Sequence, residues 1–166
     1  MDLNRLSTGE KTLGISAALL FLLSFAGIWA KVEVKGAGLG DATTKFSAWN
    51  GYGFLMKLAL ILALIAVAVV VARAAGVDMS LPYGQLYLGL GGATFLFLLL
   101  TLLIGPDESG SGSLGLISVE ISRGIGLFIG TLLAALMAFG AWMHYSGGDT
   151  ATTPSPAMPE APPPAV

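Results

Sequence analysis

The hydrophobic residues of this chain are gathered into four long blocks, separated by shorter polar or glycine-rich segments. The blocks cover residues 12–30, 52–72, 81–104 and 124–145. Their apolar side chains run continuously, without the alternation that would reserve one side for water. About 20 residues at a rise of 1.5 Å match the roughly 30 Å hydrocarbon core of a bilayer. Each block therefore predicts a membrane-spanning segment.

Lipid offers no hydrogen-bond partners to backbone amides, and an α-helix satisfies these groups within its own segment. We therefore predict an all-α membrane protein, a four-helix transmembrane bundle formed by residues 1–146. Composition agrees, since 55% of the residues are hydrophobic and only 11% are charged, whereas a soluble domain is about a quarter charged. Aromatic residues that prefer the membrane interface fall near the predicted ends; they are Trp29, Trp49, Tyr52, Tyr83, Trp142 and Tyr145.

The first block has a second interpretation, a signal peptide that is cleaved from the mature protein. Arg5 and Lys11 precede a short apolar core, and residues 24–26 have the small-x-small pattern of a cleavage site. The acidic Glu10 in the leading region favours a retained span instead. Both interpretations remain open at this stage.

An even number of spans places both termini on one side and the first and third loops together on the other. Residues 31–35 (KVEVK) and 117–122 (ISVEIS) each alternate polar and apolar positions, which is typical of a half-buried strand. We predict that these loops pair as a small two-strand β-ribbon that caps the helices. The alternative is that both segments are extended loops.

The final residues, 147–166, contain six prolines and few bulky apolar side chains. Such a segment cannot form a core, and we expect a disordered tail with polyproline II character.

The distribution of basic residues bears on orientation in the plasma membrane. Cytoplasmic termini would leave Arg5, Lys11 and Arg73 inside, and Lys31, Lys35, Lys45, Lys57 and Arg123 outside. A bare count therefore favours external termini. A short leading segment with two basic residues nevertheless resists export, and we expect the termini to be cytoplasmic.

Small residues recur at four-residue spacing along the fourth block, at Gly126, Gly130, Ala134 and Ala138. Such a ridge lets helix backbones approach closely, which drives helix association in lipid. We expect it to pack against a helix of the same chain, with Gly89 and Ala93 of the third block as one matching stripe. A face between copies of the chain is the alternative.

Two polar residues are candidate functional positions. Lys57 is the one charge inside a predicted span, where ionisable groups are often functional. It lies close enough to the helix end for its long side chain to reach the headgroups. His144 is the only histidine and has no carboxylate nearby in sequence, so we interpret it as an interfacial residue.

No pattern of reactive residues indicates an enzyme. The chain has no cysteine, which excludes thiolate nucleophiles and thiolate metal sites, and it has no nucleophile–base set or phosphate-binding loop. We therefore expect no catalytic residue, metal or cofactor. The net charge of −2 lacks the basic surface that nucleic acid requires. We also find no buried acid in the four blocks, which argues against transport.

The strings LSTGEK (6–11) and SAWNGYG (47–53), placed before the first and second spans, resemble uncharacterised small four-span membrane proteins of bacteria. The layout is also similar to claudin-type tetraspan proteins, in which strands of a tryptophan-bearing first outer loop join the last loop. The cysteine pair of such loops is missing here, so this second resemblance concerns architecture alone.

These features together predict a non-enzymatic membrane scaffold or accessory subunit, which contacts lipid and either a membrane protein partner or further copies of itself. The alternative is a small self-associating transporter or channel. Its only candidate polar lining would be Lys57, Thr94, Thr101 and Thr131.

Overall fold

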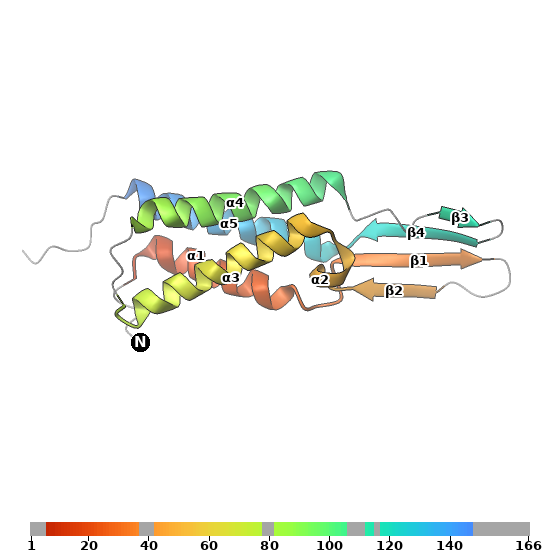
Figure 1. Cartoon of the computed structure of the whole chain (residues 1–166), viewed down its shortest axis with the longest axis horizontal. Helices are drawn as coiled ribbons and strands as arrows, with labels where there is room; N and C mark the ends of the chain where they lie inside the picture. Colours follow the sequence, from red (N-terminus) through yellow and green to blue (C-terminus); the bar gives the residue numbers. More distant parts are fainter. Residues whose placement is uncertain (1–5, 37–41, 78–81, 106–111, 115–116, 148–166) are drawn as a thin grey trace, which may run out of the picture.

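Helices and strands share one long axis in the computed structural model, with a β-sheet projecting from one end of the helices (Figure 1). The structure describes residues 6–36, 42–77, 82–105, 112–114 and 117–147. The helices are α1 (Thr8–Leu23), α2 (Ala48–Gly51), α3 (Phe54–Ala74), α4 (Tyr83–Ile104) and α5 (Ile125–Ser146). The strands are β1 (Ala30–Gly36), β2 (Ala42–Phe46), β3 (Gly112–Leu114) and β4 (Ile117–Arg123).

The four longer helices form a closed ring of contacts, in which α1 packs on α3 and α5, and α4 packs on α3 and α5. Helices α1 and α4 run toward the sheet, and α3 and α5 run away from it (Figure 1). We call the end that carries the sheet the sheet end. The opposite end, where α1 begins and α5 finishes, is the terminal end.

Three of the described helices, α3, α4 and α5, are long and apolar enough to cross a membrane. Their large apolar side chains are exposed on the outside of the helices, for example Leu132 at 64% and Leu103 at 68%. Such a surface is unfavourable in water but fits a hydrocarbon solvent. The three helices indicate a multi-pass membrane protein, and the prediction of a mostly helical fold is confirmed.

The helix that covers the first predicted span, 12–30, begins and ends earlier than that span. Helix α1 begins at Thr8, because the Ser7 side chain and the Glu10 carboxylate cap its first turn reciprocally. It ends at Leu23, whose carbonyl accepts a hydrogen bond from the Trp29 indole at 2.6 Å. With 16 residues, α1 is shorter than the three helices that are long enough to cross.

The other boundaries move by a few residues. Helix α3 begins at Phe54 instead of residue 52, and α5 covers Ile125–Ser146 instead of 124–145. Within the predicted third span, Pro82 is the N-cap of α4. The short helix α2 was not predicted. Most of the proline-rich tail, from residue 148 on, lies outside the described residues.

The two alternating loop segments pair as predicted, since β1 and β4 are antiparallel neighbours with Val32 opposite Ile121. The predicted two-strand ribbon is nevertheless too small. Strand β2 joins the free edge of β1, and β3 joins that of β4, which gives a four-stranded antiparallel sheet in the order β2-β1-β4-β3.

The sheet is fixed to the helices through Trp29, whose side chain is completely buried. The Trp29 carbonyl accepts hydrogen bonds from the Gly124 amide and the Tyr52 hydroxyl, both at 2.7 Å. Burial raises the pKa of Tyr52 to about 12, so its hydroxyl remains a donor at physiological pH. The start of α5 is held in the same way, because the Gly126 amide donates to the Ile28 carbonyl at 2.9 Å.

The small-residue ridge of α5 packs inside the chain, on two different partners. Gly126 and Gly130 lie under Ile28 and Trp29, and Ala134 is completely buried. Ala138 is half-buried and contacts α4 at Gly91. The matching stripe on α4 was therefore misplaced, because Gly89 is exposed and a methyl group there would contact nothing.

We expect Gly130→Ala to destabilise the protein. A Cβ at Gly130 would overlap the ring of the buried Trp29, and overpacking of this kind costs about 1–3 kcal/mol. Thermal unfolding of the detergent-solubilised protein, followed by tryptophan fluorescence, measures the change. Gly92→Ala is the matched control, because a Cβ there has open space. An unchanged unfolding temperature in Gly130→Ala would contradict this account of the Trp29 contact.

Candidate functional site

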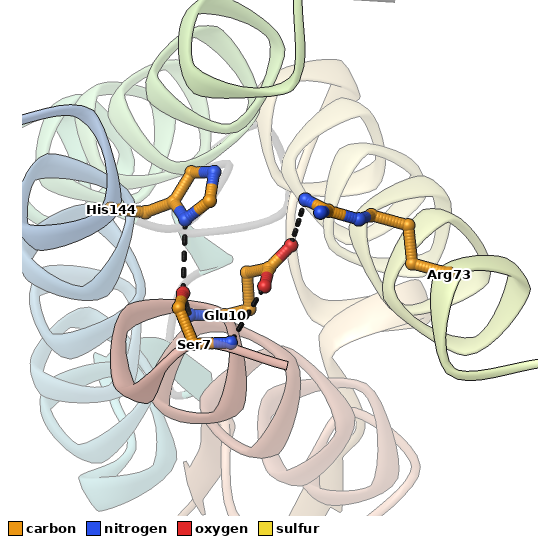
Figure 2. Close-up of polar contacts among 4 residues, drawn as sticks. All are labelled: Ser7, Glu10, Arg73 and His144. Carbon is orange, nitrogen blue, oxygen red and sulfur yellow. Dashed lines mark hydrogen bonds and ion pairs between the residues drawn. The ribbon is translucent and has the colours of Figure 1, made fainter. Parts of the chain in front are cut away.

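Polar side chains from all four long helices meet inside the terminal end. Ser7 and Glu10 come from the start of α1, Arg73 from the last turn of α3, and His144 from the last turn of α5 (Figure 2). Tyr87, in the second turn of α4, closes the group. We call these five residues the Glu10 cluster.

Glu10 is the centre of the cluster and is almost inaccessible, with 1% of its side chain exposed. One carboxylate oxygen, Oε2, accepts a hydrogen bond from the Ser7 amide at 2.8 Å. The other, Oε1, forms an ion pair with Nη1 of Arg73. A carboxylate buried this deeply is stable only when such partners replace its hydration.

Arg73 reaches the cluster from its edge, since 20% of its side chain is exposed. Its guanidinium carbon lies 4.4 Å from the centre of the Tyr83 ring, within the distance of a cation–π contact. The ion pair and this contact together hold α3 against both α1 and α4.

His144 joins α5 to the cluster. Its Nδ1 lies 2.9 Å from the Ser7 hydroxyl, within a hydrogen bond. The same hydroxyl accepts the Glu10 amide at 3.2 Å. The imidazole also meets the Tyr87 ring edge-to-face, with 5.3 Å between ring centres. These contacts of His144 were not predicted, because its partners are distant in sequence.

The Tyr87 hydroxyl lies beside the Glu10 carboxylate and the Arg73 guanidinium. It is fully buried, yet it forms no hydrogen bond that meets the usual distance and angle limits. Buried polar atoms without partners are uncommon in native proteins.

Two glycines allow α1 and α5 to approach closely enough for the Ser7–His144 contact. A Cβ at Gly9 would lie 2.6 Å from the Gly140 carbonyl oxygen and 2.8 Å from the His144 amide nitrogen. A Cβ at Gly140 would lie 2.8 Å from the Gly9 carbonyl oxygen. Any larger side chain would therefore push the two helices apart.

The cluster can hold charge, donate and accept protons, and couple helices, but it does not have the composition of a metal centre. Over the described ranges, no three His, Asp or Glu side chains come together as possible metal ligands. The sequence showed no buried acid within the four apolar blocks. Glu10 lies just before the first block, but it is a buried acid in the first turn of α1.

The residues proposed from the sequence as a polar lining lie elsewhere. Lys57 is exposed in the first turn of α3, at the sheet end, away from the Glu10 cluster. The three threonines bond to their own helices. The hydroxyls of Thr94, Thr101 and Thr131 donate to carbonyls four residues earlier, at 2.7, 2.8 and 2.8 Å. These contacts satisfy the hydroxyls locally and require no polar pore.

One signal in the sequence could have located part of the Glu10 cluster. Ser7 and Glu10 have the S-x-x-E spacing of a capping box, which fixes both residues at the start of a helix. No local signal exists for Arg73 or His144, because they lie 63 and 137 residues from their partners.

No protein-family model matches the chain, and no curated protein matches it.

We expect Arg73→Met to destabilise the protein more than Glu10→Gln. The first variant leaves a buried carboxylate without its counter-ion, which costs roughly 3–5 kcal/mol. The second leaves an arginine that can turn toward solvent, so its cost is smaller. Chemical or thermal unfolding in detergent gives both values.

The double variant completes the test as a mutant cycle and should recover part of the loss from Arg73→Met. A larger loss for Glu10→Gln than for Arg73→Met, or strictly additive effects, would contradict the ion pair described here.

Proposed function

We propose that this protein is a non-enzymatic scaffold or accessory subunit of the plasma membrane, with four spans and a sheet that contacts a partner protein. The observation that carries the proposal is the four-stranded sheet itself. It is assembled from two segments far apart in sequence and projects from one end of the helices (Figure 1).

The outer edge of this sheet fits a role in protein contact. Strand β2 is an edge strand, and its residues Thr43, Thr44 and Lys45 are all exposed. Edge strands offer unpaired backbone groups to another chain. The Glu10 cluster, in contrast, joins the long helices to one another at the terminal end, as expected of a framework that presents the sheet.

In this proposal α1 crosses the membrane as well as α3, α4 and α5. Its 16 residues cover only about 24 Å as a helix, but α1 is joined to the α2–α3 segment near both of its ends. Glu10 meets Arg73 in the last turn of α3, and the Ser24 carbonyl accepts the Ala48 amide at the start of α2, at 3.0 Å. The exposed Ile15 and Leu22 support contact with lipid along the helix.

In this arrangement both termini are cytoplasmic and the sheet is external. Arg5 before α1 and Lys11 in the first turn of α1 support this choice. The larger number of basic residues at the sheet end opposes it.

A second candidate is a transporter or channel formed by self-association. The observation in its favour is Glu10, an acid buried beside an arginine, a tyrosine and a histidine, since ionisable groups inside a membrane domain often carry ions or protons. Proton or ion flux into liposomes that is lost in Glu10→Gln, while the protein stays folded, would support this candidate over the scaffold.

Single cysteines should reveal four spans, because the chain has no cysteine of its own. Thr8→Cys, Thr44→Cys and Ser146→Cys all place a thiol at an exposed position. In intact cells a membrane-impermeant maleimide should label Thr44→Cys, and it should label the other two only after permeabilisation. Labelling of Thr8→Cys and Thr44→Cys from one side would exclude α1 as a span. If only Thr8→Cys and Ser146→Cys were labelled in intact cells, the termini would be external and the sheet cytoplasmic, the reverse of the proposed orientation.

A photo-crosslinking residue at Thr44 should capture a protein partner or a second copy of the chain. The same residue at Ile15, which is 63% exposed on α1, is the control and should contact mainly lipid. Gel shifts after irradiation of cells, followed by mass spectrometry, identify the adducts. A lone monomer at Thr44, with nothing co-purifying in mild detergent, would contradict the scaffold proposal.

A further inference from the structure

Two lysines with the same charge face each other at the root of the sheet. Lys31 of β1 and Lys45 of β2 are direct register partners in the antiparallel pair, and both side chains are exposed. Like charges opposite one another destabilise a strand pair. An anion that contacts both amines would relieve this repulsion.

The part of the chain that the structure describes does not supply that anion. No ion pair joins Lys31 or Lys45 to an acidic side chain there. Glu33 is two residues farther along β1, on the same face but toward the far end of the sheet. The two amines therefore form a local positive site at the level where the sheet leaves the helices.

The surroundings of this site mark the membrane boundary. Phe21, Phe25 and Trp49 form an aromatic cluster at the sheet end, with ring centres 5.3 to 6.5 Å apart. Phe25 is 61% exposed, and aromatic rings of this kind prefer the interface between hydrocarbon and headgroups. Lys45 lies next to Gly27, two residues beyond Phe25, so the lysines are at headgroup level.

We propose that Lys31 and Lys45, above this aromatic cluster, form a surface that binds the phosphate of acidic lipid headgroups in the sheet-side leaflet. The phosphate neutralises both amines, and the aromatic cluster contacts the upper acyl chains. This inference rests on the proposed membrane placement of the helices. It holds for either orientation, because it concerns the leaflet next to the sheet.

The test uses tryptophan quenching by brominated lipids in vesicles that contain the full-length chain. Trp29 is buried, Trp49 is at the sheet end, and Trp142 is 54% exposed in the last turns of α5, at the terminal end. A Trp142→Phe background therefore reports the sheet end, and a Trp49→Phe background reports the terminal end. Brominated phosphatidylglycerol is compared with brominated phosphatidylcholine in each.

In the Trp142→Phe background we expect brominated phosphatidylglycerol to quench more strongly than brominated phosphatidylcholine. The preference for phosphatidylglycerol should be about fivefold for each lysine near the acidic surface. Lys31→Gln with Lys45→Gln should remove the preference, and the two Arg replacements should keep it. Lys11→Gln, the control at the terminal end, should change it less than twofold. High salt should weaken the preference, since exposed charges are screened.

The repulsion between the lysines gives an independent readout. In zwitterionic detergent at low salt, Lys45→Gln should raise the unfolding temperature, because no acidic headgroup offsets the charge pair.

Three results would overturn the inference. They are an unchanged lipid preference in the double Gln variant, an equal loss in Lys11→Gln, and an unfolding temperature that falls in Lys45→Gln. Absence of quenching of Trp49 by either lipid would refute the membrane placement itself, and this inference with it. Quenching without preference would refute the lipid surface alone.

Discussion

Hydrocarbon has no hydrogen-bond partners for a peptide group, and this constraint accounts for most of the architecture. Backbone groups in the long apolar segments are satisfied within helices, and the described backbone between α1 and β1 and between β4 and α5 is joined by main-chain hydrogen bonds at the sheet end. There the Trp29 and Ile28 carbonyls accept the Gly124 and Gly126 amides. A side chain on Gly124 would overlap this backbone, and one on Gly126 would collide with the Ile28 side chain. The joint between helices and sheet is thus a set of close main-chain contacts, which explains why glycines are required at the start of α5.

The two ends of the helices have different physical characters. At the sheet end, uncharged aromatic side chains and main-chain hydrogen bonds fix the geometry, and most charges point outward. At the terminal end, an ion pair between Glu10 and Arg73 is enclosed by Tyr87 and His144. Removing one partner of a buried pair is far more costly than removing both. The cluster therefore gives the helices a specific arrangement that apolar packing against similar neighbours would leave loosely defined.

The sequence predicted the helical class and the pairing of β1 with β4, because long apolar runs and two-residue alternation are local signals. It misplaced the end of α1, since the apolar run continues through Phe25 to Trp29, while the Trp29 indole folds back onto the Leu23 carbonyl. Strands β2 and β3 were missed because ATTKF and GSL are short and do not alternate. The Ser7–Glu10 capping box could be recognised from its S-x-x-E spacing, but its contacts with Arg73 and His144 depend on how three helices pack.

The depth of α1 in the bilayer tests the central claim most directly. A spin label on Ile15→Cys, in the middle of α1 and 63% exposed at the native residue, can be compared with one on Leu132→Cys of α5. If four helices cross the membrane, both labels should collide far more often with oxygen than with a polar nickel complex. A label at Ile15 that is relaxed mainly by the nickel complex, while that at Leu132 is not, would place α1 in water and contradict the account.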